Sequence, residues 1–288
     1  MKYFTNETAS YHCADEIHSS ILSLCNLIKD FPLVIEPFKG DAEKAKVMFA
    51  KKNNAAGMFE FETCKLPFLS DRKPLFSIDS FYIVPTVKKT TLLYDIKTDS
   101  FIKIIQPLSF KSRVSSLFSN KGRSLYNLSE KLSLKGLSVP EILAYGHFHA
   151  GRKPFFVMKR IEGKSLYELL LNRKQRLPNS IYIKVMDSLL LLHSCGYWFG
   201  DLRVSHIFIK RQGISGFVDI DSIRRNIPYR LRNIAKDLAG LNHPGLLLEK
   251  DQKKRLFDYY ISRSNISKKD SLLILVKKYT ERRWRKAI

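Results

Sequence analysis

The sequence is poor in cysteine and has no long uninterrupted run of apolar residues. Only four of its 288 residues are cysteine, and no two have the C-x-x-C spacing of a zinc or redox site. A disulfide scaffold is therefore disfavoured and a reducing compartment favoured. No segment approaches the roughly 18 apolar residues of a membrane-spanning helix. Residues 1–20 lack the apolar region of a secretory signal, so we expect a cytoplasmic protein.

Negative charge is also scarce over most of the chain. Lys and Arg number 50 and Asp and Glu 27, which gives a net charge of +23. The two signs balance over residues 1–100, so the whole excess lies beyond residue 100. This distribution indicates two regions of different character and a polyanionic partner for the second. We expect no specific nucleic-acid partner, because no RNA-binding fingerprint or zinc-finger spacing is present.

Apolar residues make up 44% of the chain, enough for a core, and their periodicity predicts an α+β fold. The first part is mainly β. It has a helix over 10–31, short strands within 45–65, strands at 81–84, 90–94, 100–105 and 154–158, and a basic helix over 109–135 that ends at Gly136. From residue 165 the pattern is helical. It is interrupted by two short strands at 207–210 and 216–219.

The stretch from Phe199 to Asp221 contains the most informative motif. Asp201-Leu202 stands five positions before His206, and Asp219 ends the second short strand. A protein kinase has the catalytic loop H-R-D-L-x-x-x-N, then a strand, then the Asp of D-F-G. Phosphoryl transfer needs one carboxylate to orient and deprotonate the attacking hydroxyl and another to hold Mg²⁺ across the phosphates. The spacing of Asp201 and Asp219 fits that need.

Two upstream segments agree with this interpretation. Lys103 lies in the middle of a predicted strand, like the kinase β3 lysine that contacts the α- and β-phosphates. Met158, Lys159 and Arg160 follow a strand and precede a helix, where a kinase hinge offers backbone groups to adenine. Lysine, hinge, aspartate, histidine and aspartate therefore occur in the kinase order.

These segments resemble the Kdo/WaaP-type lipopolysaccharide kinases, distant relatives of the protein kinases. The resemblance covers roughly residues 85–262, and the histidine in place of the loop asparagine is a mark of that family. The matching motifs are Lys89–Leu92 with Phe101–Lys103, Gly136–Pro140 with Ala144–Gly146, Asp201 with His206–Ile209, Val218–Arg224, and Lys236–Leu241.

The resemblance implies a protein-kinase-like fold with a β-rich small lobe and a mostly helical large lobe. The small lobe would span residues 81–158 and the large lobe 159–288, which ends in a basic helix. Residues 1–80 would form an N-terminal extension or an added part of the small lobe. The implied activity is ATP-dependent and Mg²⁺-dependent phosphorylation of a sugar hydroxyl, on Kdo or heptose, in the lipopolysaccharide inner core.

The resemblance also implies a role for each matching residue. Asp201 would be the catalytic base, and His206 and Asp219 the metal ligands. Lys103 would hold the ATP phosphates, and Met158, Lys159 and Arg160 would flank the adenine. Asp237 would accept hydrogen bonds from the catalytic loop.

The sequence departs from the kinase pattern at three points, one of which is Asp221 in place of the D-F-G glycine. Residues 85–100 contain no glycine, so a glycine-rich phosphate loop is missing, and the segment at Lys88 and Lys89 would replace it. The helix-C glutamate would fall near Leu125, and the nearest acid is Glu130, in a different register. A catalytically inactive, kinase-shaped module that binds anionic lipid or RNA therefore stays open. A kinase acting on protein is a further alternative, which the absence of an A-P-E motif disfavours.

The C-terminal segment from Leu272 to Lys286 combines apolar residues, Trp284 and a basic cluster. Such a helix suits an anionic membrane surface, and a core-packing helix with a solvated basic tail is the alternative. With the family resemblance, this predicts peripheral attachment to the inner leaflet of the inner membrane. The expected partners are that surface and an anionic, lipid-linked core oligosaccharide. The oligomeric state is left open.

Overall fold

The chain divides into two compact units. The first, here the β-rich unit, comprises Met1–Leu128 and Glu141–Arg160, and the second, the helical unit, comprises Ser129–Pro140 and Ile161–Ile288. The computed structural model describes residues 1–30, 60–62, 75–78, 80–84, 86, 90–106, 121–149, 152–172, 174–211, 213–246 and 248–285.

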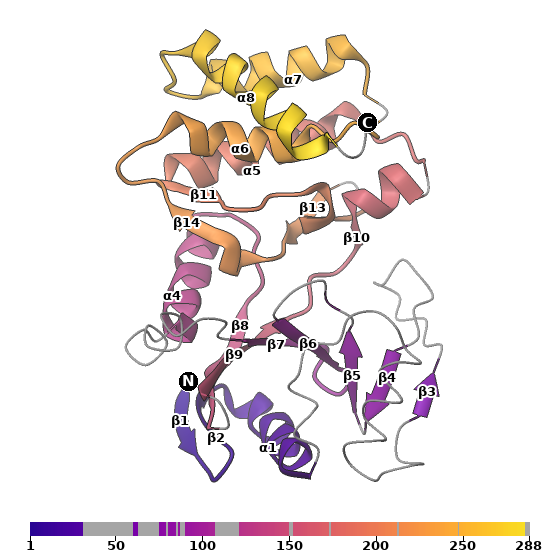
Figure 1. Cartoon of the computed structure of the whole chain (residues 1–288), viewed down its shortest axis with the longest axis vertical. Coiled ribbons are helices and arrows are strands. Elements are labelled where there is room, and N and C mark those ends of the chain that lie inside the picture. Colours follow the sequence, from indigo (N-terminus) through magenta and orange to yellow (C-terminus); the bar gives the residue numbers. More distant parts are fainter. Residues whose placement is uncertain are drawn as a thin grey trace. The chain divides into compact units, whose positions relative to one another are not determined.

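The β-rich unit is built on one antiparallel sheet, which has nine strands among the described residues (Figure 1). In spatial order these are β1 (Lys2–Thr5), β2 (Ala9–Cys13), β8 (Ile142–Phe148), β9 (Lys153–Lys159), β7 (Ser100–Ile105), β6 (Thr90–Asp95), β5 (Phe81–Val84), β4 (Leu75–Ile78) and β3 (Glu60–Glu62). Since β2 pairs with β8, with Ala9 opposite Phe148, the N-terminal segment is part of the same sheet.

Helix α1 (Asp15–Asp30) packs against this sheet through one face. Its buried residues Ile17, Ile21, Leu24 and Ile28 recur at helical spacing and join the core formed by alternate residues of the strands. The prediction of a single helix over 10–31 was wrong at its start. Residues 9–13 form β2, in which Ala9, Tyr11 and Cys13 alternate into the core.

The helical unit contains α5 (Asn179–Ser194), α6 (Leu231–Leu241), α7 (Lys250–Arg263) and α8 (Lys269–Trp284). Helix α8 packs on α6 and α7 on α5 (Figure 1). Two small sheets, β10 (Lys164–Ser165) with β12 (Ile207–Lys210) and β13 (Gly213–Phe217), and β11 (Tyr197–Phe199) with β14 (Ile223–Arg225), complete the unit with the short helical segments η3 (Glu168–Asn172), η4 (Val204–His206) and η5 (Ile220–Ser222).

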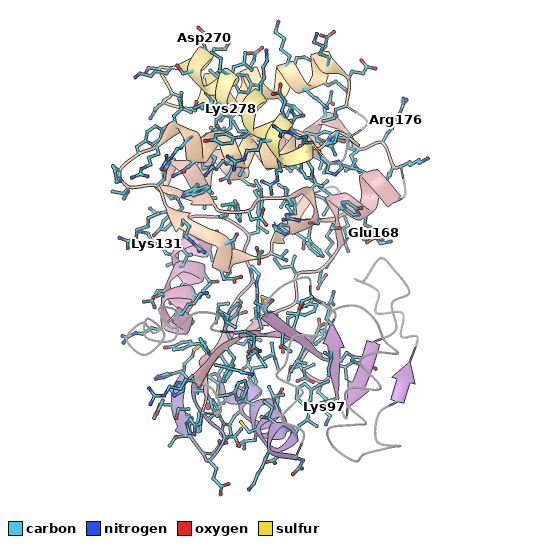
Figure 2. The ribbon with its side chains drawn as sticks, in the orientation of Figure 1. Lys97, Lys131, Glu168, Arg176, Asp270 and Lys278 are labelled. Carbon is cyan, nitrogen blue, oxygen red and sulfur yellow. The ribbon has the colours of Figure 1, made fainter. Side chains whose placement is uncertain are left out.

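Helix α4 (Lys121–Leu134) is shared by the two units. It stops at Gly136, whose φ of +87° is the left-handed cap that glycine adopts without strain, as predicted. Lys131 lies in the second half of this helix (Figure 2). In the helical unit, its ammonium lies 3.4 Å from the Tyr197 hydroxyl and 5.4 Å from the centre of the Tyr197 ring. This contact joins the second half of α4 to β11.

The predicted α+β fold class, with a β-rich part followed by a mostly helical part in the kinase order, is confirmed. The strands predicted around Asn53–Gly57, the segment at Lys88 and Lys89, and the first half of the helix over 109–135 lie outside the described residues. In the described part of the chain, no helix is both long enough and apolar enough to cross a membrane.

Candidate functional site

The loop that carries Asp201 is attached to a buried polar network. The Phe199 amide, two residues before Asp201, donates a 2.6 Å hydrogen bond to Oδ2 of Asp237, a residue of α6 that is 1% exposed. His193 Nε2 lies 3.1 Å from the same oxygen, and His193 Nδ1 lies 2.7 Å from the Tyr260 hydroxyl. The prediction that Asp237 accepts a hydrogen bond from this loop is confirmed.

Burial decides the electrostatics of this network. Desolvation raises the pKa of Asp237 to about 6, although hydrogen bonds from His193 and Phe199 and the charge of Arg283 act in the opposite direction. Burial also raises the pKa of Tyr260. The network therefore connects α5, α6, α7 and β11 through hydrogen bonds between largely buried groups.

A close backbone approach fixes the other side of the loop. A Cβ atom placed on Gly240 of α6 would lie 2.2 Å from the Leu202 carbonyl oxygen and 3.1 Å from a guanidinium nitrogen of Arg283. Only glycine leaves room for α6 at this distance. The residue that follows Asp201 is therefore packed directly on the helix that carries Asp237.

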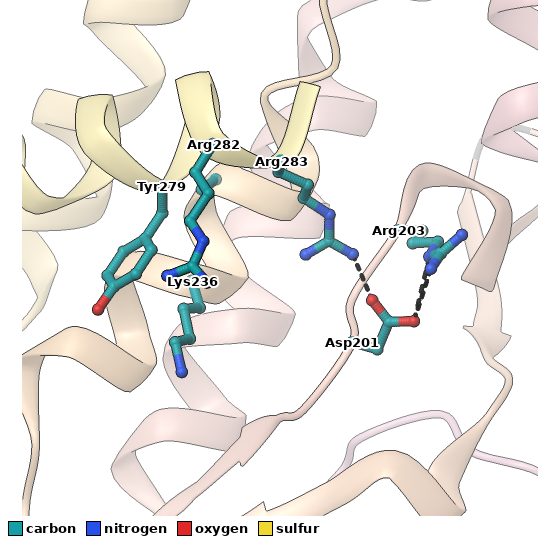
Figure 3. A pocket seen from close by; sticks show the side chains of 7 residues that line it. Asp201, Arg203, Lys236, Tyr279, Arg282 and Arg283 are labelled. Carbon is teal, nitrogen blue, oxygen red and sulfur yellow. Dashed lines mark hydrogen bonds and ion pairs between the residues drawn. The ribbon is translucent and has the colours of Figure 1, made fainter. Parts of the chain in front are cut away.

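Two arginines hold the Asp201 carboxylate (Figure 3). The Arg283 guanidinium donates to Oδ1 at 2.6 Å, and that of Arg203 donates to Oδ2 at 2.9 Å and 3.2 Å. The carboxylate is 46% exposed and the Arg283 side chain 22%. Sequence reasoning missed Arg283, because it is 82 residues from Asp201 on α8 and no local motif links the two.

His206 and Asp219 lie on neighbouring segments. The amide of Val218 donates to the His206 carbonyl at 2.9 Å, which places the residue before Asp219 beside η4. Both side chains are half-buried. The predicted strand ending at Asp219 was wrong by two residues. Strand β13 ends at Phe217, and Asp219 adopts φ 64° and ψ 38°, a left-handed turn that starts η5.

His206 and Asp219 would fit a magnesium ion only if other ligands completed its coordination shell. No group of three or more His, Cys, Asp or Glu side chains able to hold a metal occurs among the described residues. Mg²⁺ is commonly bound by one or two carboxylates together with water and substrate phosphates. Asp219 has a carboxylate that could serve in this way, and the His206 carbonyl is hydrogen-bonded to the residue before Asp219.

The other predicted residues belong to the β-rich unit. Lys103 lies on β7, between Leu92 of β6 and Phe156 of β9. Along β7, Ile102 and Ile104 enter the core that α1 covers. Since neighbouring side chains of a strand point to opposite faces, half-buried Lys103 lies on the other face of the sheet.

The segment predicted to contact adenine is tied to its neighbours. The amide of Lys159 donates to the Glu141 carbonyl at 2.9 Å, and that of Arg160 to the Asp99 carbonyl at 3.2 Å. The Arg160 guanidinium also makes a bidentate pair with Asp99, at 2.5 Å and 2.9 Å. Burial opposes ionisation of Asp99, but the hydrogen bonds from Arg160 and Tyr94 hold its pKa below the usual range. The amides of Lys159 and Arg160 and the Arg160 side chain are therefore engaged within the β-rich unit.

The structure thus groups the predicted residues by unit. Asp201, His206 and Asp219 belong to the helical unit, and Lys103 and Met158–Arg160 to the β-rich unit. On α4, Leu125 is buried and Glu130, the sole acid of the helix, is exposed. No residue of α4 therefore matches the helix-C glutamate of a kinase.

No protein-family model and no curated protein sequence matches the chain. Solved structures of WbdD show a partial likeness. The co-crystal structure with the kinase inhibitor LY294002 is 18% identical over 73% of this chain and 50% of that chain, with a TM-score of 0.46. Monomeric WbdD is 15% identical over 78% of this chain and 57% of that chain, with a TM-score of 0.47.

A further structure is described as the bifunctional kinase-methyltransferase WbdD. It is 14% identical over 77% of this chain and 50% of that chain, with a TM-score of 0.43. The chain therefore spans about half the length of these proteins. At such identities and TM-scores, the likeness assigns no activity, and the function rests on the residues of this chain.

Proposed function

We propose that the chain is an ATP-dependent kinase that phosphorylates a sugar hydroxyl, on Kdo or heptose, of the lipopolysaccharide inner core. The observation that supports this most is the anchored loop of the helical unit. The Phe199 amide is bound to buried Asp237, and Leu202 is packed on Gly240. These contacts hold Asp201 in place from both sides. A protein catalyses phosphoryl transfer mainly by holding a carboxylate and a metal-binding group in fixed positions.

Each residue has a definite part in this proposal. Asp201 orients the acceptor hydroxyl and takes its proton. Asp219 and His206 would hold Mg²⁺, which would neutralise negative charge on the ATP phosphates during transfer. Lys103 contacts the phosphates, and the carbonyl groups of Met158–Arg160 face the adenine.

The acceptor class follows from charge and from the resemblance of the loop. His206 in place of an asparagine is the feature shared with the Kdo/WaaP-type kinases, whose acceptors carry carboxylates and phosphates. A chain with a net charge of +23 attracts such acceptors and the anionic leaflet that presents them. We place the enzyme in the cytoplasm, peripherally on the inner face of the inner membrane.

A non-catalytic module that binds anionic lipid or RNA is the second candidate. Two observations favour it: the buried Leu125 where a kinase has its helix-C glutamate, and the arginines on both oxygens of Asp201. This candidate predicts that ATP does not bind in a metal-dependent manner.

Thermal unfolding with and without ATP and Mg²⁺ separates the two candidates. A ligand at 100 times its Kd adds about 2.7 kcal/mol to the free energy of unfolding, which raises the Tm of a 288-residue protein by roughly 4–5 °C. We expect this shift to need Mg²⁺, to disappear in Asp219→Ala and to persist in Asp251→Ala, a matched change of an exposed carboxylate on α7.

The transfer step is tested with radiolabelled ATP and purified core oligosaccharide. Asp201→Asn should bind ATP and Mg²⁺ like the unmodified protein but transfer no phosphate. A fully active Asp201→Asn variant would refute the role of base, and the absence of any Mg²⁺-dependent shift at millimolar ATP would refute the kinase.

A further inference from the structure

A hollow of about 400 Å³ opens beside Asp201, entirely within the helical unit (Figure 3). Its walls are formed by the loop that carries Asp201 and Arg203, by α6 and by the last turns of α8. Its charged and aromatic lining consists of Asp201, Arg203, Lys236, Tyr279, Arg282 and Arg283. The volume lies at the lower end of the range for small-molecule sites.

Positive charge in this hollow exceeds negative charge. Asp201 is its single carboxylate, and that carboxylate is shared by Arg203 and Arg283. Lys236 and Arg282 have no carboxylate partner in the part of the chain that the structure describes. Lys236 lies instead over the Trp198 and Tyr279 rings, at 5.4 Å and 5.6 Å from their centres. Four cations in a confined space repel one another unless an anion joins them.

One of these cations is held in an unfavourable environment. Arg283 is largely buried, and desolvation lowers its pKa although the charge of Asp201 acts in the opposite direction. A guanidinium stays protonated in proteins and binds carboxylate and phosphate through paired N–H groups. A second anion in the hollow would balance the positive charge that the single carboxylate of Asp201 leaves uncompensated.

We propose that this hollow binds a phosphate or carboxylate group of the acceptor, through Arg203, Lys236 and Arg282, while Asp201 orients a hydroxyl of the same molecule. The inference rests on the proposed kinase function and adds the side on which the acceptor is held. An anion fixed in the same hollow as the base makes the encounter of the two groups effectively intramolecular, which is a large source of rate acceleration.

The chain contains its own reporter for this site. Both of its tryptophans adjoin the lining residues: Lys236 lies over Trp198, and the Arg283 guanidinium lies 5.5 Å from the centre of the Trp284 ring. The Trp284 indole N–H donates to the Ala239 carbonyl, which also belongs to the hollow. Entry of an anion should therefore change the intrinsic fluorescence.

The experiment titrates mannose 6-phosphate, glucuronate, inorganic phosphate and neutral mannose into the full chain, without nucleotide, and follows tryptophan fluorescence. We expect a saturable change with at least one anionic sugar and none with mannose. Lys236→Gln and Arg282→Gln should each raise the Kd at least tenfold. Arg285→Gln removes an exposed charge from the same end of α8 outside the hollow, and should leave the Kd unchanged.

Several results would overturn the inference. They are equal affinity for mannose, an unchanged Kd in both Lys236→Gln and Arg282→Gln, or a response to inorganic phosphate alone. A response confined to phosphatidylglycerol vesicles and lost in the same variants would assign the hollow to a lipid headgroup and overturn the acceptor.

Failure of the anion site and failure of the proposed kinase activity give different experimental outcomes. Binding of an anionic sugar without Mg²⁺-dependent ATP binding would support the hollow and refute the kinase. Active transfer with an unaltered KM for the acceptor in Arg282→Gln would support the kinase and refute the hollow.

Discussion

Asp237 is a buried carboxylate that interacts with a histidine and a backbone amide. Its Oδ2 atom interacts with His193 and Phe199, and Oδ1 has no hydrogen-bond partner among the described residues. Replacing it with alanine would leave the Phe199 amide and His193 without their acceptor. Loss of one partner from a buried network of this kind costs about 3–5 kcal/mol.

The raised pKa of Asp237 predicts a pH dependence of stability. A free aspartate titrates near pH 4, while Asp237 in the folded protein titrates at about 6. Between these values the unfolded chain loses its proton first, so this residue makes the free energy of unfolding fall as the pH rises from about 4 to 6. Above that range its contribution is constant.

Asp237→Asn should remove this dependence and retain an oxygen acceptor for the Phe199 amide. We expect the stability of the unmodified protein relative to Asp237→Asn to decline from pH 4 to 6.5 in urea unfolding. Asp251→Asn, on the exposed face of α7, is the control and should show no such decline. A difference that is constant over this range would contradict the assignment.

Helix α6 contributes to the site because of one glycine. Gly240→Ala would place a methyl group 2.2 Å from the Leu202 carbonyl, so the loop or the helix must move. Overpacking of this kind costs about 1–3 kcal/mol. We expect a lower Tm and, by displacement of the neighbouring Asp201, a reduced rate of phosphate transfer.

Gly213→Ala is the matched control, since its nearest neighbour to an added Cβ, the Lys210 carbonyl oxygen, is 4.0 Å away. It should change the Tm little and leave transfer unaltered. Equal effects of the two substitutions would show that the close approach at Gly240 is not what matters. Thermal unfolding and the transfer assay together decide this.

At the level of elements, sequence patterns predicted the features that depend on residues close together in the chain. Alternation located β7 around Lys103, helical spacing located α1 apart from its start, and motif spacing located Asp201 and Asp219. The partner of Asp201 on α8 and the pairing of β2 with β8 could not be predicted, because they join segments 82 or more residues apart. Such contacts depend on which faces meet in three dimensions, and no single stretch encodes that.

The basic C-terminal helix shows the same limit. Both interpretations of it, a membrane-facing helix and a core-packing helix, rested on the same residues. In the structure Leu272 and Val276 are buried against the rest of the unit, and Ile274 is 66% exposed. One face of α8 thus belongs to the core, which the sequence pattern alone could not decide.

For the whole molecule, attachment to an anionic membrane is the remaining question of location. The segment between β14 and α6 exposes Ile227 and Tyr229, at 74% and 58%, between exposed arginines 224, 225 and 230. Apolar tips within a basic surface are what an anionic interface binds. The peripheral location proposed above therefore predicts that this segment contacts the membrane.

Co-sedimentation with vesicles containing phosphatidylglycerol measures this contact. Ile227→Ser combined with Tyr229→Ser should lower the bound fraction severalfold, and raised salt should lower it further because it screens the arginines. Leu134→Ser is the matched control, since Leu134 is 87% exposed and lies on α4. Equal losses in the double variant and in Leu134→Ser would rule out a specific contact.

The distance along the chain between Asp201 and Arg283 also has a consequence in time. A ribosome adds roughly 5–20 residues per second. Arg283 follows Asp201 by 82 residues, so it is synthesised about 4–16 s after the aspartate that it binds. Within that interval the ribosome also adds α6 with Asp237, and then Tyr260 of α7, so every residue of the buried network is synthesised before Arg283. The residues that anchor the loop of Asp201 are therefore synthesised before the arginine that completes the basic hollow.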